Sequence, residues 1–261
     1  MEYRTVRLEK RDRVYHLTLN RPDALNAISP ELIAEARSAL ARVREDEDAK
    51  ALVVRGEGRA FSAGADLKFM KGAIEGRDER LVRVLREVNE WFFDLEALPI
   101  PTVAVVKGFA LAGGLELVMA CDLALAAEDA VLGDQHINYA LMPGGGDTQR
   151  LPRKIGLQKA LYLMFTGGWL TGKQAEEWGL VLKAVPADRL EEEVEALLAQ
   201  LRDKSRHALS AIKRAVYRGI QMANWRDAVD YEVAVFQQYV ASSDHVRQGL
   251  QAFVEKRRPS F

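Results

Sequence analysis

One stretch of the sequence, residues 107–122, joins a glycine-rich turn to a helix-forming run that contains a single carboxylate. Gly113 and Gly114 stand where this helix should begin, and helix N-termini present unpaired N–H groups and a partial positive charge. Because glycine lets a ligand oxygen approach the backbone closely, the N–H of Gly113 could bind a developing oxyanion. Glu116 falls on the same side of the first turn. The arrangement favours acid–base chemistry, and the alternative is a glycine-rich helix start in which Glu116 only supports the helix.

Composition limits the class of protein. The chain has 261 residues, 48% of them hydrophobic and 29% charged, which is enough for one domain or one domain with a small appendage. The formal net charge of −1 offers no field that would attract nucleic acid or an anionic membrane as a partner. The single cysteine, Cys121, excludes a disulfide framework and a cysteine-based zinc site. Since neither a signal peptide nor a long apolar run is visible, we expect a soluble, cytoplasmic protein.

Strand-like and helical patterns alternate along residues 1–186. Ser29 and Pro30 predict an N-cap and a first helical position for a helix over residues 31–44. From residue 187 onward only helices are expected, each with an apolar stripe. The pattern predicts an α/β protein with a core domain over residues 1–186 and a C-terminal helical region over residues 187–261. Further strands are expected at residues 5–8, 13–19, 51–55, 101–106 and 122–126, and further helices at residues 79–98, 147–155 and 157–166.

Three segments in a fixed order carry a resemblance to a known family. They are FSAGADLKFM from Phe61, KGFALAGGLELVMACD from Lys107 and MPGGGDTQRLPRKIG from Met142. At this spacing they resemble the crotonase (enoyl-CoA hydratase/isomerase) family, and the resemblance extends to the C-terminal FVEKRRPSF. It implies a β-β-α superhelix with a C-terminal helical region for oligomer contacts, and an enzyme that stabilises the enolate of an acyl-CoA thioester.

The resemblance also implies roles for individual residues. The N–H groups of Ala65 and Gly113 would form an oxyanion hole for the thioester oxygen, where one such donor contributes about 2.7–4 kcal/mol. Coenzyme A would enter as part of the substrate thioester, with no bound cofactor and no metal, and the protein would be a homotrimer or a dimer of trimers. The implied coenzyme A contacts are Ala24, Ala63, Asp66, Leu67 and Lys68, together with Phe253 and Lys256, a pair that often comes from a neighbouring subunit. For Lys68 the alternative is a solvated surface lysine.

The sequence departs from the family pattern at the second catalytic carboxylate. Hydratases of this family use two glutamates to hold and split one water, and Glu116 matches the first. The second normally lies seven residues before the Pro-Gly of the next loop, and seven residues before Pro143 this chain has His136. Histidine titrates near neutral pH, so His136 can serve as acid or base, although a packed core histidine is the alternative. The missing carboxylate puts standard hydration of a 2-enoyl-CoA in doubt and also weakens an isomerase interpretation.

Asp147 is the second departure, because the family commonly has glycine there. The aromatic-acid CoA dehalogenase branch has a nucleophilic aspartate at a matching Asp-Thr, but its histidine base should come from near Asn89, where this chain has none. We therefore favour an N-cap role for Asp147 in the helix that begins at Thr148. The cyclic β-diketone hydrolase branch carries a histidine at the position of His136, but it pairs that residue with an aspartate where this chain has Gly145. The predicted pocket wall consists of Asn138, Tyr139 and Asp147.

The leading functional hypothesis is an enoyl-CoA hydratase, or a close variant that uses Glu116 with His136. One alternative is another crotonase-type activity, namely enoyl-CoA isomerase, C–C bond hydrolase, decarboxylase or thioesterase. The other is a non-catalytic relative that binds acyl-CoA or RNA. Glu116 beside two implied oxyanion donors argues against a non-catalytic protein, and the net charge of −1 argues against RNA.

Overall fold

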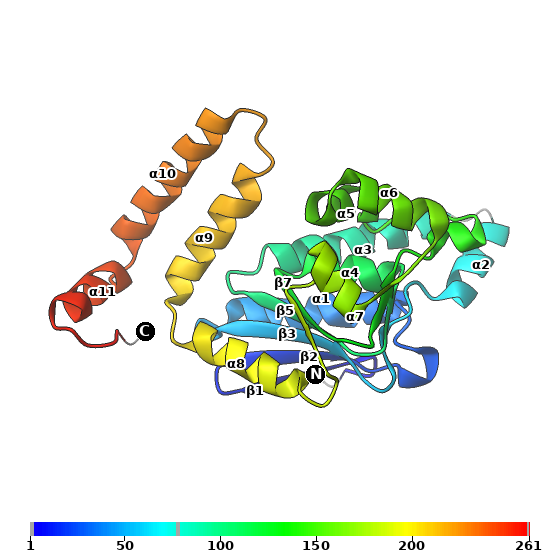
Figure 1. Ribbon diagram of the computed structural model, residues 1–261, viewed down its shortest axis with the longest axis horizontal. Coiled ribbons are helices and arrows are strands. Elements are labelled where there is room, and N and C mark those ends of the chain that lie inside the picture. Colours follow the sequence, from blue (N-terminus) through cyan, green and yellow to red (C-terminus); the bar gives the residue numbers. More distant parts are fainter. Residues whose placement is uncertain (1–2, 77–78, 260) are drawn as a thin grey trace.

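The computed structural model describes residues 3–76, 79–259 and 261, and its α/β architecture confirms the expected fold class (Figure 1). Within these residues the strands form two sheets, ordered β1-β2-β3-β5-β7-β10 and β4-β6-β8-β9. Apart from the β1–β2 and β8–β9 pairs, neighbouring strands are parallel, so helical crossovers cover the sheets. The strands are β1 (Val6–Arg11), β2 (Val14–Leu19), β3 (Ala51–Gly56), β4 (Ala60–Ser62), β5 (Thr102–Val106), β6 (Phe109–Leu111), β7 (Leu123–Ala127), β8 (Val131–Gly133), β9 (Leu170–Thr171) and β10 (Lys183–Val185).

The helices follow the apolar periodicity closely. Ser29 caps α1 by accepting a hydrogen bond from the N–H of Leu32, and Pro30 occupies the first helical position, which confirms the prediction for this helix. The α-helices are α1 (Pro30–Glu45), α2 (Leu67–Glu75), α3 (Arg80–Glu96), α4 (Gly113–Ala120), α5 (Asp147–Ile155), α6 (Leu157–Thr166), α7 (Gly172–Trp178), α8 (Leu190–Arg202), α9 (Arg206–Gly219), α10 (Trp225–Ser242) and α11 (His245–Val254), and the 3-10 helices are η1 (Pro22–Ala24) and η2 (His136–Tyr139).

Two short strands near the glycine-rich turns were not predicted. Residues 60–62 and 109–111 are absent from the expected strands, yet they form β4 and β6, which pair with each other. A strand of three residues is too short for a period-2 pattern, so only its pairing within the folded sheet identifies it. Helix α2 begins at Leu67, because the side chain of Asp66 accepts hydrogen bonds from the N–H groups of Lys68 and Phe69.

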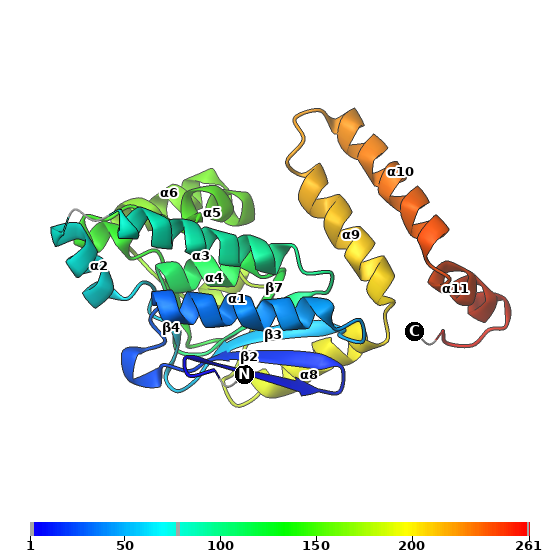
Figure 2. The same ribbon diagram turned by 180° about the vertical axis from the view of Figure 1, so that it is seen from behind.

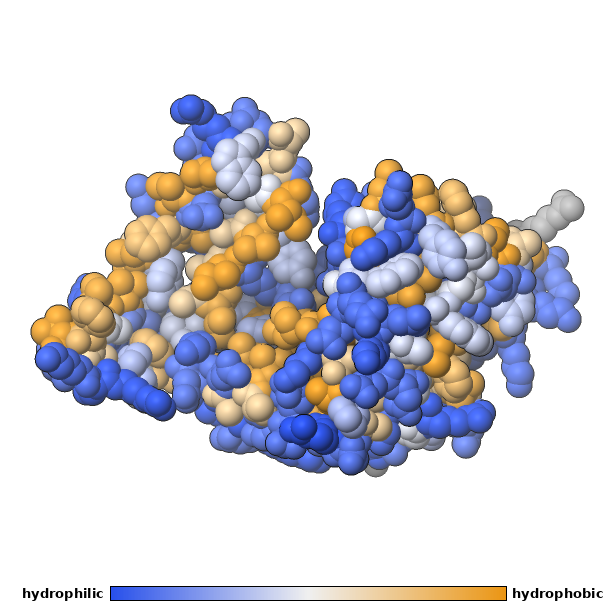
Figure 3. Space-filling view, viewed as in Figure 1, coloured by the Kyte–Doolittle hydropathy of each residue, from blue (hydrophilic) through white to orange (hydrophobic). Residues whose placement is uncertain are grey.

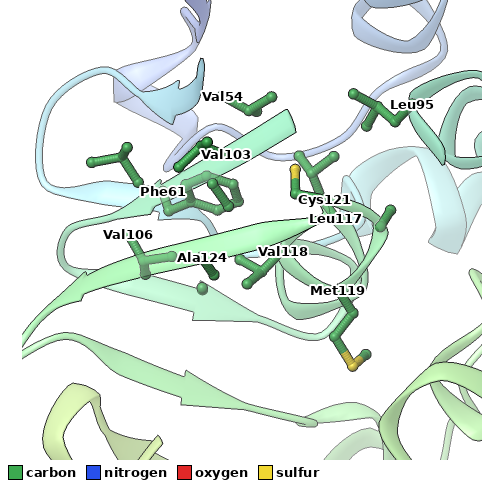
Figure 4. Packing of buried hydrophobic residues seen from close by; sticks show 14 of the residues in the cluster. Val54, Phe61, Leu95, Val103, Val106, Leu117, Val118, Met119, Cys121 and Ala124 are labelled. Atoms are coloured by element: carbon green, nitrogen blue, oxygen red, sulfur yellow. The ribbon is translucent and has the colours of Figure 1, made fainter. Parts of the chain in front are cut away.

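Helix α4 lies at the centre of the core. All of its residues are buried, and it contacts α3, α5, β4 and β6. Figure 4 shows Leu117, Val118 and Met119 of this helix among side chains from the neighbouring elements. Cys121, at the end of α4, is a free buried thiol whose pKa is raised to about 12 by burial and by the charge of Asp122. The predicted site helix is therefore fixed on every side by packing.

The last three helices project from the body of the molecule (Figures 1 and 2). Helix α9 is bound to the rest of the chain through two of its side chains. Lys213 Nζ and Tyr217 Oη donate hydrogen bonds to Asp122, each at 2.8 Å. Helix α8, by contrast, packs against β3, β7 and β10. The domain division at residue 186 stays a prediction, since α8 contacts the main sheet although it lies beyond that boundary. Among the described residues, no helix is both long and apolar enough to span a bilayer.

Candidate active site

Two loops meet where the oxyanion hole is predicted. Ile28 holds the first loop, since its N–H donates to Gly64 O at 2.8 Å and its carbonyl accepts from Asp66 N–H at 3.0 Å. Gly113 begins α4 beside this loop, and a Cβ placed on it would lie 3.5 Å from the nitrogen of Ala65. Within the described chain, the N–H groups of Ala65 and Gly113 donate to no protein acceptor. Two unused backbone donors therefore lie side by side, as an oxyanion hole requires.

Ala112, the residue before Gly113, has an unusual backbone conformation. Its φ of 48° and ψ of −118° are unfavourable for a residue with a side chain. The conformation is held by two hydrogen bonds, from its N–H to Gly133 O at 2.9 Å and from Glu116 N–H to its own carbonyl at 3.0 Å. Such strain costs on the order of 1–3 kcal/mol and clusters at functional sites. Here it sets the direction in which the chain enters α4 at Gly113.

Glu116 extends from the first turn of α4 into a nearly closed space, where it is only 3% exposed. Its Oε1 accepts hydrogen bonds from the N–H groups of Gly145 at 2.7 Å and Asp147 at 3.2 Å. Burial raises the pKa of Glu116, although the charge of His136 and the two N–H donors oppose this change. A Cβ on Gly145 would lie 2.3 Å from Glu116 Oε2, so this position admits no side chain while Glu116 keeps its place.

His136 opens η2, and Asp134 holds it in place. Its ring Nδ1 lies 2.5 Å from Asp134 Oδ1, and the same oxygen accepts the backbone N–H of His136 at 2.9 Å. Burial disfavours the charged ring, but the hydrogen bond to Asp134 and the charges of Glu116 and Asp134 raise the pKa of His136 overall. Asp134 was not predicted from the sequence. The available signal was its position directly after β8, two residues before His136, where an aspartate can bond back to the chain.

The N-cap prediction for Asp147 is wrong. Gly146, in a left-handed conformation with φ of 101°, is the N-cap of α5, and Asp147 is the first helical residue with no capping bond. This glycine moves the start of the helix by one residue and turns the Asp147 side chain into the interior. Asp147 is fully buried, and neither of its carboxyl oxygens has a hydrogen-bond partner in the described structure.

The predicted pocket wall is only partly brought together. Asp147 lies beside Asp134 and His136, with ligand atoms of all three within 4.8 Å of one another. Asn138 instead directs its Nδ2 to Gln135 Oε1 at 2.9 Å and to a backbone carbonyl, and Tyr139 is 68% exposed. The wall role of Asn138 and Tyr139 therefore stays a prediction.

The implied coenzyme A contacts fall into two distant groups. Ala24, Leu67 and Lys68 are exposed around η1 and the start of α2, and Ala63 is partly buried in the same region. Asp66 caps α2 and forms an ion pair with Arg21 at 3.0 Å. Phe253 and Lys256 lie at and just after the end of α11, at the opposite end of the molecule (Figures 1 and 2). One chain therefore does not bring the two groups together.

The comparison with known sequences agrees with this geometry. A sequence model of the enoyl-CoA hydratase/isomerase family matches residues 9–261. The chain is a member of the enoyl-CoA hydratase/isomerase family. It is 37% identical to a probable enoyl-CoA hydratase of Mycobacterium tuberculosis, with 100% of this chain and 99% of the relative aligned. It is also 34% identical to a crotonyl-CoA hydratase of Syntrophomonas wolfei, with 100% and 99% aligned.

Solved structures of the family share the fold. An enoyl-CoA hydratase from Bacillus anthracis superposes with a TM-score of 0.92 at 33% identity, covering 98% of each chain. A hydratase structure from Geobacillus kaustophilus gives a TM-score of 0.92 at 34% identity over 100% of this chain and 99% of that one. The β-β-α arrangement and the C-terminal helices are thus those of the enoyl-CoA hydratase/isomerase family.

Proposed function

We propose that this family member is an enoyl-CoA hydratase in which Glu116 and His136 share the acid–base work. The observation that carries the proposal is their setting. A buried carboxylate with a raised pKa and a histidine with a raised pKa interact electrostatically beside two unused N–H donors. Groups with displaced pKa values that converge on oxyanion donors are typical of enolate chemistry. The names of the relatives support the same class of reaction.

Glu116, His136 and the two backbone N–H donors each perform a different step of the proposed hydration. Ionised Glu116 takes a proton from water, the water oxygen attacks the β-carbon of the 2-enoyl thioester, and the double-bond electrons move onto the thioester oxygen. The N–H groups of Ala65 and Gly113 stabilise this oxyanion. Protonated His136 then gives its proton to the α-carbon as the carbonyl re-forms. Proton exchange between Glu116, His136 and solvent restores the starting state, so one water is consumed for each 3-hydroxyacyl thioester formed.

A panel of thioesters tests this assignment. We expect crotonyl-CoA to be hydrated faster than 3-enoyl-CoA is isomerised, as measured from loss of the conjugated enoyl absorbance and by product analysis. Isomerisation moves a proton between two carbons and adds no water, so its product differs from the 3-hydroxyacyl thioester. Faster turnover of 3-enoyl-CoA would therefore replace the hydratase assignment with an isomerase.

We also propose that the enzyme binds its thioester without a metal. The two backbone donors provide the stabilisation of oxyanion charge for which a Lewis acid would otherwise be needed. Calorimetry with acetoacetyl-CoA, an analogue with a comparable thioester oxygen, should give the same affinity with and without excess EDTA. Absence of binding at millimolar analogue, or binding that EDTA abolishes, would contradict this prediction.

A homotrimer or a dimer of trimers is proposed as the functional assembly. The projecting helices expose a broad apolar surface (Figure 3), and the two groups of coenzyme A residues could meet only between chains. Light scattering should therefore give three or six times 29.2 kDa, while a stable monomer of 29.2 kDa would contradict the proposal. The exposed apolar residues of these helices and of the α9–α10 connection are Ile212, Val216, Ile220, Trp225, Val229, Val233, Phe236, Val240, Leu250, Phe253 and Val254.

A further inference from the structure

Asp134 and Asp147 form a buried carboxyl pair behind His136. Both side chains belong to residues with 0% exposure, and ligand atoms of the two carboxyls lie within 4.8 Å of each other. Oδ1 of Asp134 is hydrogen-bonded to the ring Nδ1 of His136 and accepts the backbone N–H of the same residue. Its Oδ2 and both oxygens of Asp147 have no partner in the described structure. Three unpaired carboxyl oxygens in one closed space require an explanation.

Two negative charges cannot both be held there without compensation. An ionised buried carboxylate without hydrogen bonds is strongly disfavoured, and a second one nearby increases the cost. A single proton removes this conflict, since a neutral Asp147 can donate to the free Oδ2 of Asp134. Asp134 then keeps its negative charge for His136. The arrangement resembles other close carboxyl pairs in which one proton is shared because both groups cannot ionise together.

We propose that Asp147 is a neutral carboxylic acid that shares its proton with Asp134, and that this acid pair is the positioning device for His136. Asp134 fixes the ring through Nδ1 and leaves Nε2 as the nitrogen free to exchange a proton. The Asp147 side chain is closed off from solvent, and we assign its effect on His136 to its contact with Asp134. The role assigned to His136 rests on the proposed function, whereas the shared proton does not.

The charged groups around the pair agree with this assignment. Burial and the negative charges of Asp134 and Glu116 raise the pKa of Asp147 to about 9. Arg150, one turn along α5, opposes this change. Its guanidinium, however, is bound to Glu96 on α3 at 2.7 Å and to the carbonyl of Gly145 at 2.8 Å. The ring of His136 on η2 is bound to Asp134, and the charges of Asp134 and Glu116 favour its protonated form.

The melting temperature of Asp147→Asn, followed against pH, tests the shared proton. Asparagine keeps the shape and stays neutral. In the parent, a folded-state pKa of about 9 against an ordinary value of 3.8 means that stability is lost as pH rises between these values. We therefore expect the variant's melting temperature, minus that of the parent, to increase steadily from pH 5 to pH 9. Asp129→Asn, at an exposed aspartate before β8, is the matched control and should give a difference that does not change with pH.

Two results would overturn the shared proton. One is a difference between Asp147→Asn and the parent that stays flat or falls as pH rises. The other is a divalent cation bound by Asp134, His136 and Asp147, whose carboxylate and imidazole groups are suitable ligands. The parent would then contain about one metal ion per chain, it would melt at a lower temperature after EDTA treatment, and Asp147→Asn would be destabilised at every pH.

Asp134→Asn tests the positioning role separately. Because the ring loses its charged partner, the alkaline limb of kcat/KM should move to lower pH, with lower turnover at pH 7 than in the parent. A folded Asp134→Asn protein with the parent's pH profile would rule out the positioning role. If the parent shows no hydratase activity at all, the proposed function fails, and the melting experiment still decides whether Asp134 and Asp147 share a proton.

Discussion

Glu116→Gln should lower turnover of a 2-enoyl-CoA by roughly 10²–10⁴-fold, the usual contribution of general acid–base catalysis. Glutamine keeps the length of the side chain, and its oxygen can still accept hydrogen bonds from the N–H groups of Gly145 and Asp147. It cannot take the proton of the attacking water. Steady-state kinetics should therefore show the loss in kcat, while the affinity for acetoacetyl-CoA changes little.

Glu90→Gln is a suitable control for this variant, because Glu90 is an exposed residue of α3 and should retain parental kinetics. A folded Glu116→Gln protein with more than about a tenth of parental turnover would contradict the role of Glu116 as the base, given the 10²-fold minimum expected. Loss of analogue binding together with turnover would point to disruption of the pocket.

His136 variants should have the second-largest effect. His136→Gln removes the proton donor but can keep a hydrogen bond to Asp134, so turnover should fall by about 10²-fold or more. If the ring only packs, this variant should keep its turnover and change stability instead. His136→Glu restores the two-carboxylate arrangement of the family, and we expect it to hydrate crotonyl-CoA faster than the parent.

The hydration rate of His136→Glu should depend on whether Asp134 is present. A glutamate at position 136 would place a third carboxyl beside Asp134 and Asp147, so its gain should be larger when Asp134 is changed to asparagine as well. An unchanged or lower hydration rate in both folded variants would mean that the pocket, beyond this one residue, is adapted to a different acid–base pair.

The sequence predicted the elements that local chemistry specifies. Ser29 with Pro30 marks the start of α1, and Gly113 with Gly114 marks the start of α4, because caps and glycine-rich helix starts are local features. The family resemblance, carried by three motifs, was confirmed by the family match over residues 9–261. The pairing of Glu116 with His136 was implied by the family resemblance and stays a prediction, although the charge of each residue affects the pKa of the other.

The sequence could not predict features that depend on long-range contacts. The side chain of Asp147 turns inward because Gly146 adopts φ of 101° and becomes the cap, a conformation that the string Gly-Gly-Gly-Asp leaves open. Asp134, which directly follows β8, lies beside Asp147 of α5 only in the folded chain. The proposed coenzyme A role of Phe253 and Lys256 would depend on how chains assemble, which no pattern within one chain specifies.

The pH dependence of crotonyl-CoA hydration, measured as kcat/KM for the parent and for His136→Gln, tests the pairing of Glu116 with His136 most directly. Ionised Glu116 and protonated His136 together predict a bell-shaped profile for the parent. Its acid limb should lie above the ordinary pKa of a glutamate, 4.5, and its alkaline limb above that of a histidine, 6.5, since both pKa values are raised. His136→Gln should lose the alkaline limb and keep the acid one. A parent with no hydration activity, or the same alkaline limb in both proteins, would contradict the pairing.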